Sequence, residues 1–383
     1  MPPLAHQSVR CLATILTALA SLALSGCGRI ATAPSVLPEP PLGLEKPAPL
    51  VTVYKGEDLS KLEAHDLLRR AREFFSRGDD RTGAQFQYQA VTKTGTDQYD
   101  LACCLARLGE VDAAFYWLQV AGQEDGVDAP RAEQDSDLAR LRADARWSKV
   151  SRYLHECAAY WAAHGQPVTY VRAPKAADGE QPKALLLWLH GSNTGPDFRT
   201  DAEAVVLESI ADKLNIAIVG VSGTVPFGKA KFSWSEDPDA DYQRIEAALS
   251  DTAKRWKLTR EHVILIGFSQ GAQVGLEVAA RHPESFAGAI AIAPGATSGS
   301  HLKDAKPAQS LANCRFIVAA GALDIPPRLE IARIDAAELR SKDAKVLVQP
   351  FARSGHSFPP DFADRFPKWL RFIEKAQGEP SVQ

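Results

Sequence analysis

The sequence predicts a doubly wound, mainly parallel α/β sheet that follows a small all-helical domain. From about residue 167 onward, short apolar runs alternate with segments of helical periodicity, which is the pattern of a parallel sheet covered by helices. Residues from about 58 to 165 have helical patterns and no convincing strand. The composition, with 45% hydrophobic and 24% charged residues over 383 positions, is ordinary for globular protein and leaves room for both domains.

The first residues of the chain have the composition of an export signal. Arg10 is the only Lys or Arg before an apolar run of fourteen residues, Cys11–Leu24, which is too short to cross a bilayer comfortably. The quartet Leu24–Cys27 resembles a bacterial lipobox, in which cleavage before the cysteine frees its thiol and amine for lipid attachment. We therefore expect a lipoprotein signal peptide over residues 1–26 and lipidation of Cys27. An ordinary signal peptide that contains a cysteine is the alternative.

A lipid on Cys27 would anchor the protein to a membrane surface without a transmembrane helix. Residue 28 is Gly rather than Asp, and by resemblance to proteobacterial lipoproteins this favours the outer membrane, on the side that faces the periplasm. Residues 27–57 carry six prolines between Pro34 and Pro49 and few large apolar groups. We expect this segment to be an extended tether between the lipid and the folded domains.

Residues 58–165 are predicted to form a helical domain that resembles tetratricopeptide repeats. The residues at the packing positions of that motif are Leu101, Ala102, Leu105, Gly109, Ala114, Leu118 and Ala121. Gly109 is expected to turn the helical hairpin, and Gly78 has the same place in an upstream, degenerate pair. A helix from Trp147 to about Ala163 is expected to cover the two pairs. Binding of a protein partner and simple packing on the next domain both stay open for this domain.

Four cysteines follow the export signal, namely Cys103, Cys104, Cys157 and Cys314. An oxidising periplasm would permit a disulfide, and Cys104 with Cys157 is one pairing that the sequence allows. Buried unpaired thiols are the alternative. The spacing of the cysteines does not indicate a metal site, and we expect no catalytic role for them.

Residues 166–376 are predicted to form the α/β domain, with a short tail at 377–383. Its expected strands are Pro167–Arg172, Ala184–Leu189, Ile216–Val221, Val263–Phe268, Ala287–Ala293, Phe316–Ala320 and Lys345–Val348. Ligands of such sheets bind beyond the carboxyl ends of the strands, and the motifs described next all lie there.

The most informative motif is Gly267–Gly271, with Ser269 at its centre. It follows the unbroken apolar run Val263–Ile266, which is typical of a strand buried on both faces, and it precedes residues with helical periodicity. The two glycines allow strand and helix to approach closely around a strained turn that exposes the serine hydroxyl. The setting predicts a nucleophile elbow.

A serine hydroxyl is a weak nucleophile until a base removes its proton, and a third group must orient that base. Asp324 follows the apolar run Phe316–Ala320, and His356 follows the run Lys345–Val348, so each lies in a loop at a strand end. We expect Ser269, Asp324 and His356 to form a catalytic triad. Taken alone, Asp324 has the alternative of capping the next helix, and His356 that of an ordinary surface or packed histidine.

Acyl transfer also needs two backbone N–H groups that stabilise the oxyanion. Gln270, directly after the nucleophile, offers one. Ser192 is expected to offer the other, because it follows His190 and Gly191 at the end of an apolar strand. His190 itself is expected to brace the loop by hydrogen bonds. A simple glycine-containing turn is the alternative for this loop.

Residues from about 167 to 375 resemble the phospholipase/carboxylesterase group of the α/β-hydrolase superfamily, which includes small esterases and acyl-protein thioesterases. The shared marks are Leu189–Gly191, Gly267–Gly271, Asp324 and Gly355–His356, in the chain order nucleophile, acid, histidine. The resemblance implies an α/β-hydrolase fold and cleavage of carboxylic esters or thioesters through an acyl-serine intermediate, without a metal or an organic cofactor. The family's common Leu-Gly-Asp after His-Gly is replaced here by Ser192–Thr194, so the resemblance does not define the shape of the acyl pocket.

Residues 222–241 form the longest irregular stretch near the expected site. Within it, Trp234 is a candidate wall of the substrate pocket, with a packing role as the equal alternative. Only about twenty residues separate Ala293 from Phe316, which leaves no room for a large lid. We therefore expect an open, shallow cleft that suits short acyl or aryl esters.

The net charge of −3 and the lack of a dense Lys/Arg block exclude nucleic acid as an expected partner. The leading interpretation is a serine hydrolase for esters or thioesters that is tethered to the bacterial cell envelope. A prolyl-oligopeptidase-like peptidase shares the fold and the triad order, but its companion domain is usually a β-propeller. A non-catalytic, repeat-based envelope scaffold is the third interpretation, and it would have no need of the serine, aspartate and histidine.

Overall fold

The structure is a computed structural model that describes residues 33–175, 181–201, 203–235, 237–295, 301–304, 310–324, 328–352 and 354–374. The expected signal peptide over residues 1–26, the lipidation site Cys27 and the tail at 377–383 lie outside the described residues. Within the described part of the chain, none of the helices combines the length and the hydropathy that crossing a membrane requires.

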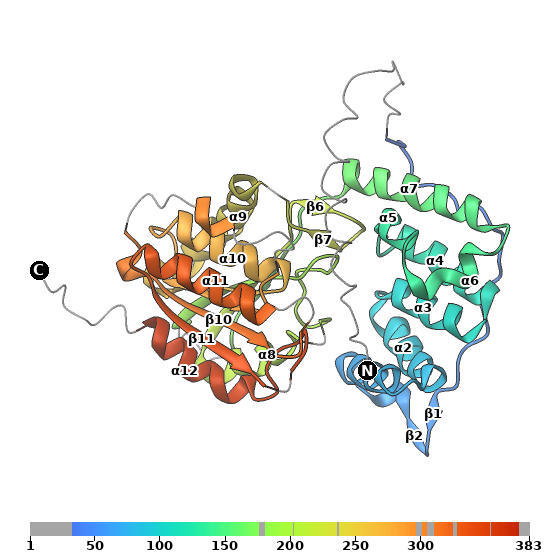
Figure 1. Ribbon diagram of the computed structural model, residues 1–383, viewed down its shortest axis with the longest axis horizontal. Helices are drawn as coiled ribbons and strands as arrows, with labels where there is room; N and C mark the ends of the chain where they lie inside the picture. Colours follow the sequence, from blue (N-terminus) through green and yellow to red (C-terminus); the bar gives the residue numbers. More distant parts are fainter. Residues whose placement is uncertain are drawn as a thin grey trace, which may run out of the picture. The chain divides into compact units, whose positions relative to one another are not determined.

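The amino-terminal half of the described chain is helical, as the sequence predicts (Figure 1). Its helices are α1 (Ala64–Ser76), α2 (Asp80–Thr94), α3 (Gln98–Leu108), α4 (Val111–Gln123), α5 (Ala129–Ala132), α6 (Ala139–Arg142) and α7 (Trp147–His164). Consecutive helices pack in pairs, α1 with α2 and α3 with α4, and α7 packs on α4. Gly109 ends α3 in the left-handed conformation with φ 83°, which is the backbone geometry expected where the chain turns back.

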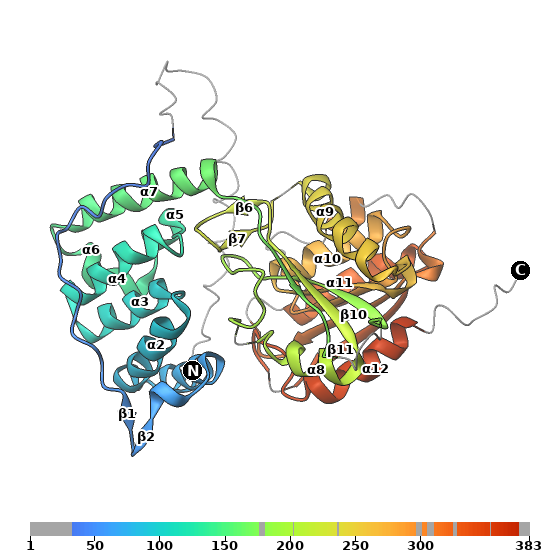
Figure 2. The same ribbon diagram turned by 180° about the vertical axis from the view of Figure 1, so that it is seen from behind.

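The proline-rich segment differs from the free tether that was expected. Residues 34–50 run along the helices, where leucine side chains of the segment pack on the helical core. The course of the segment can be followed in dark blue from α7 to the hairpin of β1 (Val53–Tyr54) and β2 (Glu57–Asp58) in both views (Figures 1 and 2). The expectation of a segment free of the folded domains was wrong. The segment has few apolar residues on average, but burial of its four leucines on the helices is enough to hold it there.

All seven expected strands are present and form one sheet. They are β3 (Thr169–Arg172), β4 (Ala184–Leu189), β5 (Ile216–Val221), β8 (Val263–Phe268), β9 (Gly288–Ile292), β10 (Arg315–Gly321) and β11 (Lys345–Phe351). Their order in the sheet is β11-β10-β9-β8-β4-β5-β3, and every neighbouring pair is parallel except β3 with β5. The prediction of a mainly parallel sheet is confirmed.

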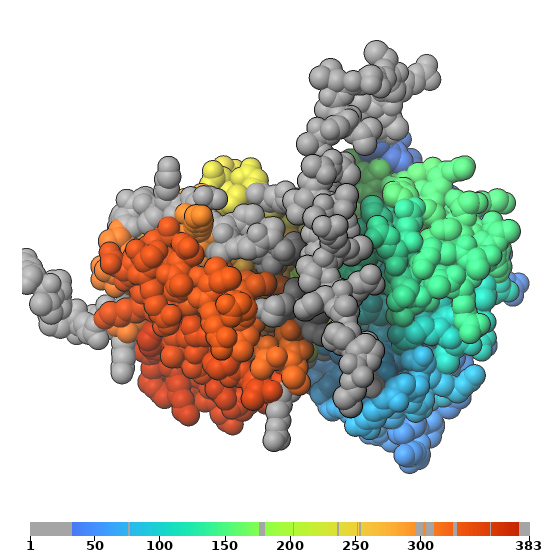
Figure 3. Space-filling model, in the orientation of Figure 1, coloured from blue at the N-terminus to red at the C-terminus, as the bar shows by residue number. Residues whose placement is uncertain are grey.

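In the described part of the chain, five α-helices cover the sheet. They are α8 (Val206–Leu214), α9 (Pro238–Trp256), α10 (Gln270–Arg281), α11 (Arg328–Ser341) and α12 (Phe362–Glu374). Helices α9, α10 and α11 belong to the core on one face of the sheet, and α8 and α12 belong to the core on the other. In the space-filling view the residues of α11 and α12, orange to red, form a continuous outer surface (Figure 3).

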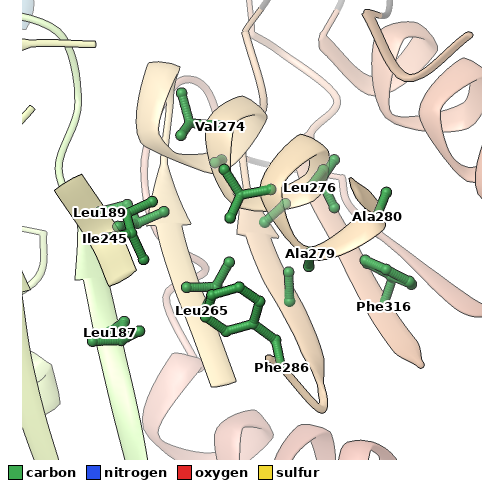
Figure 4. Packing of buried hydrophobic residues seen from close by; sticks show 14 of the residues in the cluster. Leu187, Leu189, Ile245, Leu265, Val274, Leu276, Ala279, Ala280, Phe286 and Phe316 are labelled. Carbon is green, nitrogen blue, oxygen red and sulfur yellow. The ribbon is translucent and has the colours of Figure 1, made fainter. Parts of the chain in front are cut away.

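The side chains of β4 point alternately to the two faces of the sheet, so this one strand contributes to the cores on both faces. Leu187 and Leu189 point to the face where Leu276 of α10 packs, as Figure 4 shows. Leu186 and Trp188 point to the opposite face, in the core that contains α8 and α12. Because successive side chains of a strand point to opposite faces, a strand buried on both faces must be apolar at every position. This double burial anchors the strand end that leads into the loop of Gly191 and Ser192.

A partly buried ion cluster joins the helical region to the small hairpin of β6 (Val225–Pro226) and β7 (Phe232–Ser233). Lys231 Nζ lies 2.9 Å from Asp97 Oδ1 and 3.2 Å from Asp125 Oδ2. The Asp125 carboxylate also accepts the Gln98 N–H at 2.9 Å. Burial raises the pKa of Asp125 to about 6, and the nearby Lys231 ammonium opposes this rise.

The four cysteines of the described residues are buried free thiols. The disulfide that the sequence allows between Cys104 and Cys157 is therefore not formed in this structure, and the alternative of buried thiols holds. Burial raises the pKa of Cys157 to about 11 and also raises the pKa of Cys103. These thiols are protonated at neutral pH, which makes them poor nucleophiles.

Candidate active site

Ser269 lies at a tight turn between β8 and α10, with φ 54° and ψ −118°. A non-glycine residue at positive φ is strained, and the surrounding backbone must hold it there. Its N–H donates to the Ile292 carbonyl at 3.0 Å, and its own carbonyl accepts the N–H groups of Ala272 and Gln273. The turn has the backbone geometry of the predicted nucleophile elbow.

Two glycines make this turn sterically feasible. A Cβ atom on Gly267 would lie 2.3 Å from the Gly271 carbonyl oxygen. A Cβ atom on Gly271 would lie 2.2 Å from the Leu189 oxygen and 2.4 Å from the His190 oxygen. The obstructing atoms are backbone in both cases, so strand and helix would have to separate to admit a side chain.

We expect Gly271→Ala to destabilise the protein by about 3 kcal/mol or more, because main-chain atoms of β4 must move. Gly275→Ala is the matched control on the same helix. Its new Cβ would meet only Leu189 Cδ1 at 3.4 Å and Leu265 Cβ at 3.8 Å, so the free energy of unfolding should stay within about 1 kcal/mol of the wild type. Urea unfolding of both variants checks the difference, and equal stabilities would contradict this account of the turn.

The structure brings Asp324 and His356 together. Asp324 Oδ2 lies 2.8 Å from His356 Nδ1, and the carboxylate side chain is only 1% exposed. Arg328 Nε lies 3.7 Å from the same oxygen. The His356 imidazole is partly exposed and packs against the ring of Phe268, with 4.8 Å between the ring centroids. Since Phe268 immediately precedes Ser269, the histidine ring contacts the residue that leads into the elbow.

The loop after β4 also approaches the serine. A Cβ atom on Gly191 would lie in ordinary van der Waals contact with Ser269 Cβ, at 3.5 Å. The loop is fixed by Ser233, whose hydroxyl lies 2.9 Å from Ser192 Oγ and accepts the Asn193 N–H at 3.1 Å. The loop that carries Ser192 is thereby held near the nucleophile, and the role of the Ser192 N–H as an oxyanion donor stays a prediction.

Trp234 lies beneath this loop rather than at a surface. Its side chain is buried, and its indole N–H donates to the His190 carbonyl at 2.8 Å. Its main chain exchanges two hydrogen bonds with the Gln270 side chain, which accepts from the Trp234 N–H at 3.1 Å and donates to the Trp234 oxygen at 2.9 Å. These contacts agree with the packing role of Trp234, and they connect the loop that carries Ser192 to the first residue of α10, Gln270.

His190 is completely buried and braces the loop after β4 by hydrogen bonds, as the sequence predicts. Its Nε2 accepts the Gly223 N–H at 3.0 Å, and its Nδ1 lies 2.7 Å from the Gly191 oxygen. These partners require a neutral imidazole that carries its proton on Nδ1. Burial lowers the pKa of His190 to about 4.

This lowered pKa predicts a specific loss of stability in acid. An unfolded histidine titrates near pH 6.5, so the unfolded chain binds a proton before the folded chain does. The contribution of His190 should therefore be complete above about pH 6.5 and should fall as the pH decreases toward about 4, by about 3 kcal/mol in total. His190→Gln should be less stable at neutral pH and should lack this part of the pH dependence. Urea unfolding of both proteins across this range checks the difference, and parallel pH profiles would refute it.

Glu203 is a residue near the site that sequence reasoning missed. Its carboxylate accepts the Phe358 N–H at 2.7 Å and lies 3.1 Å from the Arg72 guanidinium of α1. Phe358 follows His356 by two residues, and its ring packs against Phe268 with 5.6 Å between centroids. Glu203 thus connects a helix of the amino-terminal region to the loop that carries the histidine. A contact over 155 positions leaves no local pattern in the sequence.

Glu203→Ala should lower kcat by about tenfold with a smaller change in KM, because the freed loop holds the imidazole less well. Arg72→Ala keeps the bond to Phe358 and should have a weaker effect. Steady-state kinetics on a small ester, combined with thermal unfolding, separates a positioning role from a loss of fold. Unchanged kcat in Glu203→Ala would show that the bond does not position the histidine.

One group of side chains in the described residues has the donor atoms of a metal site, namely Cys103, Asp135 and Asp137. Its carboxylates have other partners, because Asp135 accepts from the Tyr99 hydroxyl at 2.8 Å and Asp137 pairs with Arg107 at 2.9 Å. The raised pKa of Cys103 keeps its thiol protonated, whereas metals bind the thiolate. These residues do not suit a metal ion.

Residues 235–362 match the model of the Phospholipase/Carboxylesterase family. The matched segment begins before α9 and ends at the first residue of α12, so it contains Ser269, Asp324 and His356. NocK from Nocardia uniformis subsp. tsuyamanensis, a protein whose name proposes an esterase, is 29% identical over 124 residues. These residues make up 32% of this chain and 35% of NocK, so the match spans about a third of that relative.

Solved structures of other proteins resemble part of this chain. The carboxylesterase of Bacillus cereus is 19% identical, with a TM-score of 0.44, and the alignment covers 56% of this chain and 98% of that chain. Acyl-protein thioesterase 2 of Zea mays is 18% identical, with a TM-score of 0.39, and the alignment covers 55% of this chain and 100% of that chain. The family match and the order of the sheet assign the α/β-hydrolase fold to this region.

Proposed function

We propose that this protein is a serine hydrolase that cleaves carboxylic esters or thioesters through an acyl-serine intermediate. The observation that carries the proposal is the pairing of the buried Asp324 carboxylate with His356 Nδ1 at 2.8 Å, together with the contact of the His356 ring with Phe268, the residue before the strained Ser269. A buried acid in this position holds the imidazole in the tautomer whose Nε2 is free to accept a proton. The family match over residues 235–362 supports the same class of reaction.

In the proposed reaction, Ser269 Oγ attacks the carbonyl carbon while His356 takes the hydroxyl proton. The negative charge that develops on the substrate oxygen is stabilised by the N–H groups of Ser192 and Gln270. His356 then gives its proton to the departing alkoxide or thiolate, which leaves an acyl group on the serine. Water, deprotonated by the same imidazole, releases the acid and restores the enzyme.

The other two interpretations have less support. A prolyl-oligopeptidase-like peptidase would carry a β-propeller, whereas α1 to α7 are helices. A non-catalytic scaffold would have no reason to keep a strained serine together with an acid–histidine pair. Backbone strain lowers the stability of the folded protein, and it is found mainly at sites where it serves a function. A fluorophosphonate probe tests the proposal directly, since it reacts with activated serines. Mass spectrometry should find the adduct on the peptide that contains Ser269, and an unlabelled, folded protein would contradict hydrolase activity.

We also propose that the enzyme is a lipoprotein of the bacterial cell envelope, at the outer membrane and facing the periplasm. The support is the lipobox-like quartet Leu24–Cys27. Cys27→Ser should move the protein out of the membrane fraction or leave an unprocessed precursor, while activity on small esters is kept. Equal membrane partitioning of this variant and the wild type would refute the lipid anchor.

A further inference from the structure

Residues 34–50 lie on the helical region in the manner of a bound peptide. From Leu37 to Leu44 partly buried and exposed side chains nearly alternate, which is the pattern of an extended chain with one face on a surface. The side chains that pack on the helical core are Leu37, Leu42, Leu44 and Leu50. In contrast, Val36 is 73% exposed.

Glutamine side chains of the helices bind the backbone of this segment. The side-chain amide of Gln119 in α4 forms two hydrogen bonds with the backbone of Leu42. Its Oε1 accepts the Leu42 N–H at 2.9 Å, and its Nε2 donates to the Leu42 oxygen at 3.4 Å. On the same helix, Gln123 donates to the Pro38 oxygen at 3.3 Å. Gln89 of α2 donates to the Leu50 oxygen at 3.5 Å.

The glutamines depend on the segment for their partners. Gln119 is only 2% exposed and Gln89 only 5%, and buried amides are costly unless they form hydrogen bonds. An amide that binds main-chain N–H and C=O groups accepts any extended chain, whatever its side chains. Selection among sequences must therefore come from the apolar contacts that the leucines make.

The segment does not fill this face completely. A cavity of about 340 Å³ lies between residues 47–51 and helices α2, α3 and α4. Its lining includes Tyr88, Leu105, Leu108 and Trp117. A ligand with a larger apolar side chain at this place would bury more surface than the chain's own alanine and prolines do.

We propose that this glutamine-lined face is a peptide-binding site that residues 34–50 occupy as an intramolecular ligand. Its external ligand is an extended, proline-containing segment of a partner protein, with leucine or a larger apolar residue at alternating positions. Prolines favour such a ligand because they hold it extended before binding and so reduce the entropy lost. The partner must displace residues 34–50, whose connection to α1 gives them a high effective concentration. The inference does not depend on the proposed hydrolase activity.

Hydrogen exchange tests the intramolecular contact in the full chain. The Leu42 amide should be strongly protected in the wild type and should exchange near the rate of an unfolded peptide in Gln119→Ala. Gln123→Ala, which removes a contact to the Pro38 oxygen only, is the control and should leave Leu42 protected. An unprotected Leu42 amide in the wild type would overturn the proposal.

Competition tests the external ligand, with a labelled peptide that copies residues 34–51 as the probe. The double variant Leu42→Asp/Leu44→Asp should bind the peptide at least about tenfold more tightly than the wild type, because the internal competitor is weakened. Val36→Asp adds a similar charge at an exposed position of the same segment and should behave as the wild type. Addition of Gln119→Ala to the double variant should abolish binding.

A second experiment tests the same proposal even if the double variant fails to fold. A protease recognition sequence inserted after Val51, which is 59% exposed, allows the segment to be cut after the protein has folded. The labelled peptide should exchange into the cut protein and not into the uncut one. Failure to exchange would overturn the proposal. Dimers that form through exchanged segments would overturn it as well, because the occupant would then be a second copy of this chain.

Discussion

Ser269→Ala should reduce kcat/KM for a small activated ester by about 10⁴-fold or more, because the attacking oxygen is removed. The fold should be unaffected, since the change leaves no large cavity and the backbone bonds of the elbow do not involve the hydroxyl. Hydrolysis of an aryl ester, measured together with thermal unfolding, checks both parts of this expectation.

Ser209→Ala on α8 serves as the control, because it removes a hydroxyl of the same size from an exposed position. It should keep wild-type activity. Substantial activity in Ser269→Ala would assign the reaction to another nucleophile. A loss of activity in both variants would point to a general effect on the fold.

Asp324→Asn should lower kcat by about 10³- to 10⁴-fold while the protein stays folded. The amide has nearly the shape of the carboxylate, but it cannot stabilise the imidazolium that forms when His356 takes the serine proton. It also favours the wrong tautomer, because an amide N–H directed at Nδ1 needs an acceptor there. Steady-state kinetics and circular dichroism together measure the effect.

Asp239→Asn, in the exposed first turn of α9, makes the same chemical change away from the site and should be silent. The alternative considered for Asp324 was a helix cap. A cap predicts the opposite pattern, with a loss of about 1 kcal/mol in stability and little change in turnover. The two readouts therefore separate the catalytic acid from a cap in one experiment.

The central strands of the α/β region could be predicted from the sequence because both of their faces are buried. Strands β4, β5 and β8 begin and end where the sequence predicts, because each is an unbroken apolar run that is buried along almost its whole length. Once those strands are placed, parallel order brings their carboxyl ends to one edge. Asp324 and His356 follow the ends of β10 and β11, two neighbouring strands of the same parallel sheet, so their proximity could be expected without knowledge of any contact between them.

Residues that act over long separations in the chain were not predictable. Gln119 binds Leu42 across 77 positions, and this contact made the proline-rich segment a packed element rather than a free tether. Its leucines are too widely spaced to give a local signal of burial. Glu203 and Trp234 are similar cases, because their roles follow from hydrogen bonds to loops that the fold brings near, and neither lies in a recognisable motif.

Because Asp97, Asp125 and Lys231 form one ion cluster, we expect substitutions at these three positions to occur together in related proteins. In the intact chain, loss of the ammonium would leave the buried Asp125 carboxylate and the partly exposed Asp97 carboxylate without a counter-charge, and breaking a buried ion pair costs about 3 to 5 kcal/mol. Joint replacement of all three by apolar residues avoids that cost. Relatives that keep the helical region should therefore change these positions together, whereas relatives without it are free to vary at the position of Lys231.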